Sequence, residues 1–417
     1  MARRIKFKET TVKGPALQQV CILLLACIVS SVPAVSEELT SPEQPHNTDV
    51  FVSGQDVYHT YRIPALLTTK KGTLLAFCEG RKATRSDSGN IDLLVKRSVD
   101  NGNTWSRRQV VWNDRENTCG NPCPVVDQQT GTIWLLMTWN RGDDRESAIK
   151  KNTGRDTRRV WVSRSNNDGR TWSKPIEITA TAKRPEWRWY ATGPGVGIQL
   201  QKGPWKGRMV IPCDHSVVSA NDPDGYNSHV IISDDHGKTW YIGGVISPKV
   251  NECQIVELDN GTLMINMRNY DRSKTTRAIA TSTDGGITFS KVTHDPVLVE
   301  PICQASFLRY TLRSKHGRNR LLFSNPAHAQ RGDRRDMTVR LSYDEGRSWP
   351  VSKLIYTGPS AYSCLTILPN GNIACLYEAG PKNPYEKIIF TSFTLEWLTG
   401  GVEKTGNSKK KLSIIPR

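Results

Sequence analysis

Three arginines stand beside apolar, strand-like runs of the sequence, where a charged side chain is unusual. Arg62 lies in "YRIPALL", Arg268 in "INMRN", and Arg331 a few residues after "SNP". A guanidinium group can form two parallel, charge-assisted hydrogen bonds with a carboxylate. Three such groups in one pocket would make it electropositive and require an anionic ligand. Arg334 and Arg335 follow closely and leave the third position open; a lone arginine at such a place is usually a solvated strand end.

Three further residues have side chains suited to acid–base or nucleophilic chemistry. Tyr362 lies between small residues in "SAYSC", Glu252 lies in the strand-like "NECQIVEL", and Asp87 lies in the polar loop "SDSGNIDL". Phenols and carboxyl groups can act as nucleophile, base or acid when a cleft holds them together. Taken singly, they would be a packing tyrosine, a strand glutamate and a turn aspartate. Asp92, in the strand after the loop, is a weaker candidate for an acid.

A repeated eight-residue turn indicates the scaffold that must position these side chains. "SVDNGNTW" at 98–105 returns at four other places, and the copies are "SNNDGRTW" (165–172), "SDDHGKTW" (233–240), "STDGGITF" (282–289) and "SYDEGRSW" (342–349). Serine and aspartate can close a tight turn through hydrogen bonds to nearby backbone groups. The glycine permits a left-handed backbone, and the final aromatic residue anchors the turn in a core. The motif is therefore structural rather than catalytic.

The spacing of the turns predicts the fold. They recur roughly 50 to 70 residues apart, and short apolar runs bounded by Gly, Asn, Asp and Pro lie between them. We expect an all-β protein, a six-bladed β-propeller of four-stranded antiparallel blades spanning residues 50–400. Each turn should join the third and fourth strands of a blade. The last blade should contain residues 388–398 and be completed by an N-terminal strand.

The two ends of the chain differ from this region in composition. A basic start precedes the apolar run "VCILLLACIVSSV", so residues 1–36 are typical of a secretory signal. An uncleaved anchor and a lipoprotein signal are the alternatives. Residues 37–49 are predicted to be a linker and residues 401–417 a basic tail. The net charge of +17 suits an anionic substrate, and the sequence shows no pattern typical of nucleic-acid binding.

The cysteines point to no metal site. Eight remain after the predicted signal, several of them in apolar runs, so either disulfide bonds or buried thiols are expected. "CGNPC" at 119–123 has no second ligand pair at zinc-binding spacing. The sequence also contains no phosphate-binding loop and no supported Ser-His-Asp set. We expect neither a metal nor another cofactor.

The repeated turn resembles the Asp-box of the sialidase (neuraminidase) superfamily. The candidate residues also follow the order found in that superfamily, Arg, Asp, Glu, Arg, Arg, Tyr, Glu, over nearly all of residues 50–400. The departures are confined to the turns: Asn167 replaces the usual aspartate, Phe289 the tryptophan and Ser348 the threonine. They concern the stability of the turns rather than chemistry.

The resemblance implies a role for each candidate. It makes Asp87 the acid and base, Tyr362 the nucleophile and Glu252 its base. Substrate binding would fall to Arg62, Arg268, Arg331, Glu378, Trp187 and Trp189. Among these the arginines would bind a carboxylate, Glu378 of "CLYEAG" would hold Arg62, and the tryptophans would line an N-acetyl pocket with Tyr190, or pack between blades. Glu79, Asn121 and Asp214 are weaker candidates for the cleft wall.

The activity implied is that of an exo-α-sialidase, a glycoside hydrolase that removes terminal sialic acids from glycoproteins, glycolipids or oligosaccharides with retention of configuration. A trans-sialidase, an enzyme for another nonulosonic acid, and a non-catalytic propeller that binds anionic glycans or a protein are the alternatives. We expect an exported monomer, secreted, periplasmic or lysosomal, without a membrane span after signal cleavage. Nucleic acid is not an expected partner.

Overall fold

The structure of the protein is a computed structural model that describes residues 8, 10, 11, 43–218 and 224–403. By its internal contacts the chain divides into two units, residues 1–41 and 42–417, and all described strands and helices belong to the second. This unit is all-β, as predicted. Its helices are short: α1 (Glu146–Lys150), α2 (Thr179–Ala182), α3 (Arg313–His316) and α4 (Leu395–Leu398). Most of the predicted signal and residues 404–417 of the predicted tail lie outside the described residues.

The first sheet contains eight strands. They are β2 (Thr60–Thr68), β3 (Leu74–Arg81), β4 (Ile91–Ser98), β5 (Gln109–Trp112), β6 (Thr118–Val126), β7 (Ile133–Asn140), β8 (Arg159–Ser165) and β9 (Ile176–Glu177). Strands β2 to β5 pair antiparallel in chain order, and so do β6 to β9. One parallel contact between β4 and β6 joins the two groups.

Two smaller sheets follow in the chain. Their strands are β10 (Tyr190–Thr192), β11 (Ile198–Gln199), β12 (Met209–Ser216), β13 (Tyr226–Ser233) and β14 (Tyr241–Ile246), then β15 (Val250–Glu257), β16 (Leu263–Asn269), β17 (Thr276–Ser282) and β18 (Thr293–Val299). The first of these sheets has the order β10-β12-β13-β14, with β11 also on β12, and the second has the order β15-β16-β17-β18. All the pairs are antiparallel.

The fourth sheet joins the end of the chain to its beginning. Its strands are β19 (Ser306–Thr311), β20 (Arg320–Pro326), β21 (Arg335–Ser342), β22 (Val351–Ile367), β23 (Ile373–Ala379), β24 (Lys387–Phe393) and β1 (His46–Val52). The long β22 pairs with β21 through its first part and with β23 through its last part. β1 pairs antiparallel with β24, so an N-terminal strand completes the last group as predicted. This strand starts inside the segment 37–49, which is therefore not a linker throughout.

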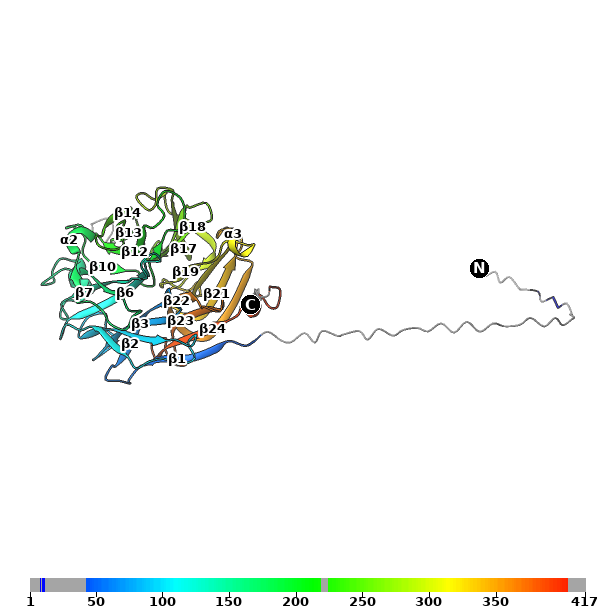
Figure 1. The fold of residues 1–417 in the computed structure, drawn as a ribbon, viewed down its shortest axis with the longest axis horizontal. Coiled ribbons are helices and arrows are strands. Elements are labelled where there is room, and N and C mark those ends of the chain that lie inside the picture. The colour runs from blue at the N-terminus through cyan, green and yellow to red at the C-terminus, as the bar shows by residue number, and fades with distance from the viewer. Residues whose placement is uncertain (1–7, 9, 12–42, 219–223, 404–417) are drawn as a thin grey trace, which may run out of the picture. The chain divides into compact units, whose positions relative to one another are not determined.

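One strand from each successive group takes part in a closed circuit of contacts. β2 contacts β6, β6 contacts β12, and the contacts continue through β15, β19 and β22 back to β2. Figure 1 shows the strands following the chain around this unit, from β1 and β2 in blue through green β12 and β13 to β23 and β24 in orange and red. Apolar side chains of neighbouring groups pack between them, as Phe390 of β24 does with Trp105 of the first turn, and Phe77 of β3 with Trp172 of the second. This arrangement is consistent with the predicted propeller.

Each repeated turn joins two neighbouring antiparallel strands, and its own residues hold it closed. In the first copy, between β4 and β5, the Ser98 hydroxyl oxygen accepts the Gly102 N–H at 2.9 Å. Asp100 accepts the Ser98 hydroxyl at 2.7 Å and the Thr104 N–H at 3.0 Å. The indole N–H of Trp105 donates to the carbonyl of Gly102 at 3.1 Å. The turn leaves few polar groups unsatisfied, as its composition predicts.

The turn with Asn167 in place of the usual aspartate keeps the same geometry, with one hydrogen bond reversed in direction. Asn167 Oδ1 accepts the N–H of Thr171 at 2.9 Å, and Asn167 Nδ2 lies 2.7 Å from the Thr171 hydroxyl oxygen. In the copies that have aspartate, the threonine hydroxyl donates instead, as Thr239 does to Asp235 at 2.6 Å. The turn therefore tolerates asparagine at this position, because a threonine hydroxyl can donate or accept a hydrogen bond.

The turns also attach each group of strands to the preceding one. A Cβ atom at Gly102 would lie 2.2 Å from the ring of Phe390 on β24, and one at Gly237 would lie 2.2 Å from Trp134 on β7. The Trp105 ring packs edge-on against Phe390, with 5.4 Å between centroids. Glycine is required here both for its positive φ, 90° at Gly102, and for the close approach. The motif is thus a clamp between neighbouring groups.

The described residues contain no helix long and apolar enough to cross a membrane. The eight cysteines that follow the predicted signal are buried, unpaired thiols. Of the two states expected from the sequence, the structure therefore has the buried thiols. Burial raises the pKa of each of these thiols, for example to about 12 at Cys364, which makes them poor nucleophiles.

We predict that Asp100→Asn destabilises the protein in a pH-dependent way. The side-chain hydroxyl and then the backbone N–H of Thr104 lower the pKa of Asp100 to about 2, below its ordinary value, so the ionised form adds stability above about pH 4. This contribution is lost as the pH falls through 2. Urea unfolding should show the variant less stable by up to about 1 kcal/mol at pH 7, with the difference vanishing towards pH 2. A difference independent of pH would contradict this account.

Candidate active site

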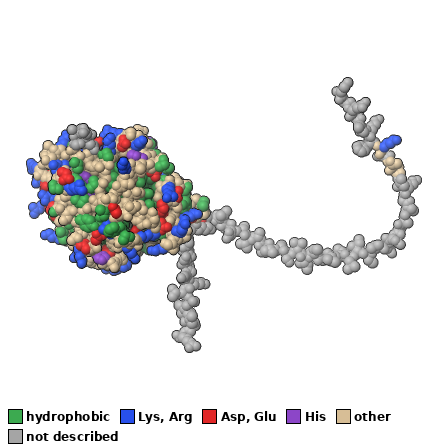
Figure 2. Space-filling model, turned by 90° about the horizontal axis from the view of Figure 1, so that it is seen from above, with side chains coloured by type: hydrophobic (Ala, Val, Ile, Leu, Met, Phe, Trp, Pro, Cys, Tyr) green, Lys and Arg blue, Asp and Glu red, His purple; other side chains and the backbone are tan. Residues whose placement is uncertain are grey.

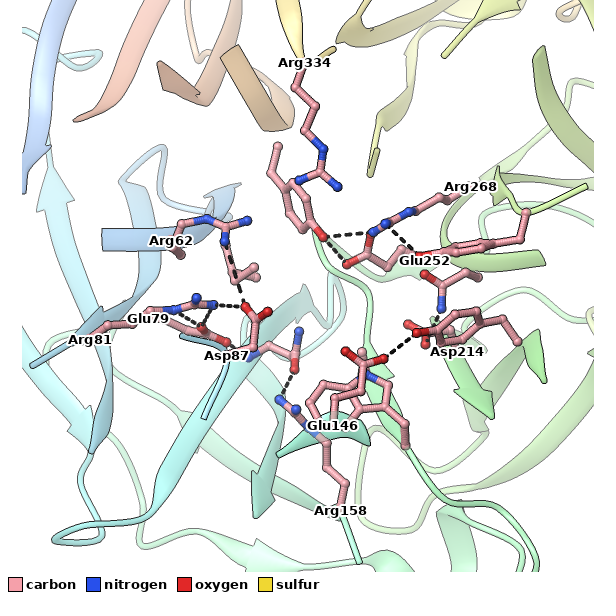
Figure 3. Close-up of a pocket in the computed structure, with 18 of the residues that line it drawn as sticks. Arg62, Glu79, Arg81, Asp87, Glu146, Arg158, Asp214, Glu252, Arg268 and Arg334 are labelled. Carbon is pink, nitrogen blue, oxygen red and sulfur yellow. Dashed lines mark hydrogen bonds and ion pairs between the residues drawn. The ribbon is translucent and has the colours of Figure 1, made fainter. Parts of the chain in front are cut away.

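Most of the predicted side chains meet in one pocket of about 210 Å³. Charged and aromatic residues form nearly all of its wall, and Figure 3 shows them converging from several groups of strands. The predicted residues that line it are Arg62, Asp87, Trp189, Glu252, Arg268 and Tyr362, with the weaker candidates Glu79, Asn121 and Asp214. Residues far apart in the chain are therefore brought together by the closed circuit of strands.

Tyr362 and Glu252 form a short hydrogen bond in this pocket. The phenol of Tyr362, on β22, donates to Glu252 Oε1, on β15, at 2.6 Å. The Nη1 atom of Arg268, on β16, donates both to Glu252 Oε2 at 2.6 Å and to the Tyr362 oxygen at 3.2 Å. Burial, and then the charge of Glu252, raise the pKa of Tyr362 well above its ordinary value although three arginines oppose the shift. The phenol is therefore neutral, and its proton points at a carboxylate.

Glu378 holds Arg62 in place, at the position where the sequence resemblance expects it. Its Oε1 atom accepts the Arg62 Nε–H at 2.7 Å and the Ile63 N–H at 2.8 Å, and Oε2 accepts the Tyr362 N–H at 3.2 Å. Glu378 is fully buried. Ile63 has a left-handed backbone with φ of 59°, a conformation that strains a β-branched residue. The same carboxylate thus binds the guanidinium and the strained backbone that presents it.

The third guanidinium beside Tyr362, after those of Arg62 and Arg268, belongs to Arg334 and not to Arg331. Arg331 is exposed and does not line the pocket. Arg334 donates to the carbonyl of Ile302 at 3.1 Å and to the hydroxyl of Tyr385 at 3.2 Å, and its guanidinium lies 5.6 Å from the centre of the Tyr362 ring. No carboxylate of the described residues pairs with it. The assignment to Arg331 is corrected because the loop after β20 turns that side chain outward.

Asp87 lies at the mouth of the pocket, and its side chain is 60% exposed. Arg81 Nη2 lies 2.7 Å and Arg62 Nη1 lies 3.9 Å from Asp87 Oδ1. Burial tends to raise the pKa of Asp87, but the charges of Arg81 and Arg62 outweigh it and lower the value to about 2. Glu79 orients Arg81 through contacts of 3.0 and 2.6 Å. In the ligand-free pocket Asp87 is therefore an ionised carboxylate.

Of the two predicted tryptophans, only Trp189 lines the pocket. Trp187 is 2% exposed and stacks on His215 with 3.6 Å between ring centroids, so it belongs to the core. Trp189 packs against Arg158, whose guanidinium lies 3.9 Å from the ring centre. The prediction for Trp187 as a binding residue is wrong, and the packing alternative holds for it. The backbone between the two residues is irregular, so a spacing of two does not put them on one face.

One part of the pocket wall carries two carboxyl groups whose pKa values are raised. Burial, and then the charge of Glu252, raise the pKa of Asp214 well above its ordinary value. Its Oδ1 atom accepts a hydrogen bond from Asn251 at 2.8 Å, while Oδ2 is buried without a partner among the described residues. Burial also raises the pKa of Glu146, which accepts the hydroxyl of Tyr226. These groups could hydrogen-bond a neutral, hydroxyl-rich ligand.

Comparison with known proteins identifies the family. Residues 72–375 match the family model of the BNR repeat-like domain. Over 364 residues the chain is 34% identical to a sialidase of Micromonospora viridifaciens, and over 376 residues it is 32% identical to an exo-alpha-sialidase of Aspergillus fumigatus. These alignments cover 84% and 82% of this chain. The chain belongs to the sialidase superfamily.

Solved structures agree with this membership. A structure described as Hadza microbial sialidase Hz136 is 33% identical, with a TM-score of 0.74 over 84% of this chain and 69% of that one. The Trypanosoma rangeli sialidase in complex with sialic acid, at 20% identity and a TM-score of 0.67, shares the fold over 84% of this chain and 59% of that chain. The chain spans only 54% of the Micromonospora relative and 61% of one from Bacteroides fragilis, but 86% of the Aspergillus one.

Several pocket residues of this superfamily member were not predicted from the sequence. They are Ile63, Arg81, Glu146, Arg158, Ala191, Tyr226, Asn251, Tyr270 and Tyr385. The signal that found Arg62, a charge beside an apolar run, also applies to Arg81 at the end of β3 and to Arg158 just before β8. Glu146 and Tyr385 carry no such signal, because they lie in loops or short helices whose position depends on the tertiary fold.

We predict that Glu378→Gln lowers the free energy of unfolding by about 3 kcal/mol, because it leaves the buried guanidinium of Arg62 without its counter-charge. Urea unfolding at neutral pH measures this. Glu177→Gln is the matched control, since it removes the exposed partner of Arg159 at 3.4 Å and should cost less than about 1 kcal/mol. Equal losses in the two variants would show that Glu378 does not anchor the site.

Proposed function

We propose that this protein is an exo-α-sialidase that releases terminal α-linked sialic acids from glycoproteins, glycolipids or oligosaccharides. The observation that carries the proposal is the hydrogen bond between Tyr362 and Glu252, 2.6 Å long, inside a pocket lined by five arginines, of which Arg62, Arg268 and Arg334 lie around Tyr362. Membership of the sialidase superfamily and the relatives named above support the substrate class.

The three arginines around Tyr362 would bind the carboxylate of the sugar. Arg62 and Arg268 are each neutralised by a glutamate, at 2.7 and 2.6 Å, while Arg334 has no such partner among the described residues. Arg334 therefore offers an unpaired positive charge at a place of low solvent exposure, where a bidentate carboxylate contact is strong. Glu378 and Glu252 keep the guanidiniums apart without occupying the position of the ligand.

Tyr362 would be the nucleophile because the substrate itself repels an anion. The carbon under attack carries a carboxylate, and a neutral phenol approaches it without charge repulsion; a tyrosine nucleophile distinguishes sialidases from most glycosidases. As the Tyr362 oxygen bonds to the anomeric carbon, Glu252 takes the phenolic proton and the glycosidic C–O bond breaks. Arg268, hydrogen-bonded to both residues, would stabilise the charge that moves between them.

Asp87 would donate the proton to the leaving oxygen and then take one from water. Water attacks the same carbon, Asp87 accepts its proton, and the Tyr362 oxygen leaves and recovers its proton from Glu252. Two displacements give retention of configuration. The low pKa of Asp87 in the free protein must rise for the first step. A bound carboxylate would neutralise the nearby arginines, and a bound sugar would exclude water, and both effects raise it.

We further propose the architecture and location that accompany this function. The six blades would be β2–β5, β6–β9, β10–β14, β15–β18, β19 to the first part of β22, and the rest of β22 with β23, β24 and β1. Residues 1–36 would direct export, which suits an enzyme that acts on glycans outside the cytoplasm.

We predict that Tyr362→Phe abolishes most of the activity, since it removes only the nucleophilic oxygen. Release of methylumbelliferone from its α-sialoside should fall at least about 100-fold. Tyr377→Phe is the matched control, because it removes a buried hydroxyl that bonds to Thr391 at 2.9 Å, outside the pocket. NMR detection of α-sialic acid as the first product would support retention.

Three results would count against this assignment. Undiminished hydrolysis by Tyr362→Phe would reject Tyr362 as nucleophile. Sialic acid transferred to an added galactoside in place of water would favour a trans-sialidase. Wild-type protein that is folded, binds sialosides and hydrolyses none of them would favour a glycan-binding propeller.

We predict that the two neighbouring arginines behave differently. Arg334→Gln should lower both kcat/KM and the affinity for a dehydrated sialic acid analogue about 100-fold, because it removes a charged partner of the carboxylate. Arg331→Gln, a substitution of an exposed residue three positions earlier, should change either quantity less than about twofold. Calorimetry and steady-state kinetics measure the pair. The reverse order of effects would restore Arg331 as the third arginine.

A further inference from the structure

A second pocket, here called the outer pocket, continues from the active-site pocket past Asp87. It has a volume of about 540 Å³. Ser86, Asp87 and Ser88 form one wall, and residues 145–151, which include α1, form the other. Asp87, Glu146 and Tyr226 line both pockets, so the two are continuous. Figure 3 shows Asp87 and Glu146 on the side of the active-site pocket away from Arg334.

Among the described residues, the outer pocket is lined by three cationic side chains and two carboxyl groups, and the charge of Lys150 acts on Glu146. Arg145, Lys150 and Lys151 all line it, and none of them forms an ion pair with a carboxylate of the described residues. Arg145 and Lys151 are exposed, and the Lys150 ammonium lies 3.9 Å from the centre of the Tyr226 ring. The two carboxylates of the pocket are already engaged, Asp87 with Arg81 at 2.7 Å and Glu146 with the Tyr226 hydroxyl.

The chemistry of the proposed reaction fixes which part of a substrate reaches this space. The carboxylate of the terminal sialic acid is directed at Arg62, Arg268 and Arg334. Asp87 must lie within hydrogen-bond reach of the glycosidic oxygen to protonate it. The leaving group begins at that oxygen, so it extends past Asp87 and away from the three arginines. The wall that contains Asp87 is the one that the outer pocket shares.

We propose that the outer pocket is a leaving-group subsite that selects sialosides whose next sugar is itself acidic. The inference rests on the proposed exo-sialidase function and adds the class of substrate. Three cations on one short segment, facing the place where the leaving group must lie, would attract a carboxylate or a sulfate on that sugar. A neutral leaving group such as lactose would gain nothing from them.

The experiment compares kcat/KM for four substrates: methylumbelliferyl sialoside, sialyllactose, sulfated sialyllactose and a sialyl-sialic acid disaccharide. The wild type should prefer the acidic leaving groups to sialyllactose by about tenfold, a size set by two screened ion pairs. Arg145→Gln/Lys151→Gln should lower kcat/KM for them about tenfold more than for sialyllactose. Raising the salt concentration to about 0.5 M should narrow the preference in the wild type.

Matched variants separate this effect from a change in overall charge. Lys71→Gln/Arg170→Gln removes one lysine and one arginine that are exposed and line neither pocket, and it should keep the preference. Lys151→Glu should weaken the preference for acidic leaving groups further than Lys151→Gln does. Thermal unfolding checks that each variant is folded. The sulfated and sialylated substrates together show whether any anion suffices or a carboxylate is required.

The outcomes distinguish this inference from the function on which it rests. Hydrolysis of methylumbelliferyl sialoside without any preference for acidic leaving groups would overturn the subsite alone. An equal loss on all four substrates in Arg145→Gln/Lys151→Gln would do the same, since the residues would then act on the sialic acid. No hydrolysis of any substrate would overturn the proposed function, and the subsite with it.

Discussion

The buried carboxylate of Glu378 is the contact on which the site depends most. It binds the guanidinium of Arg62 from the first long strand, the backbone N–H of the strained Ile63, and the N–H of Tyr362 from β22. These groups come from opposite ends of the chain. A single pair of oxygens therefore sets both the position of one carboxylate-binding arginine and the backbone that carries the proposed nucleophile. Such a pair is worth little as stabilisation alone, because desolvation offsets it, but its loss leaves a buried charge.

The remaining charges follow from the same arrangement. Arg62, Arg81 and Arg268 each contact a glutamate, whereas Arg158 and Arg334 have no carboxylate partner among the described residues. The compensation decides protonation states: Tyr362 keeps its proton beside Glu252, while Asp87 loses its proton beside Arg81. The arginines of such a pocket can stabilise negative charge on a ligand, because the pocket's own carboxylates do not cross the cavity to bind them.

Local patterns predicted the scaffold better than the site. The turns at 98–105 and 233–240 carry their own hydrogen bonds, so their sequence determines their structure. Arg62 was found because it is a charge beside an apolar run, and Tyr362 because it lies between small residues in a stretch that resembles a sialidase motif. Arg331 and Arg334 lie together in one loop, where no periodicity tells which side chain turns inward. Trp187 and Trp189 are separated by irregular backbone. Tyr385 lies in the connection between β23 and β24, and its place in the pocket depends on the tertiary fold.

The pairing of β1 with β24 determines how late in synthesis the chain can complete its fold. The strand that covers the edge of β24 lies more than three hundred residues earlier in the sequence. The last sheet therefore cannot be completed until nearly the whole chain has left the ribosome or, if it is exported, the translocation channel. Until then β24 would present bare backbone groups to any neighbouring strand. The fold is therefore completed late and in one step, and the chain is most prone to aggregate just before β1 pairs with β24.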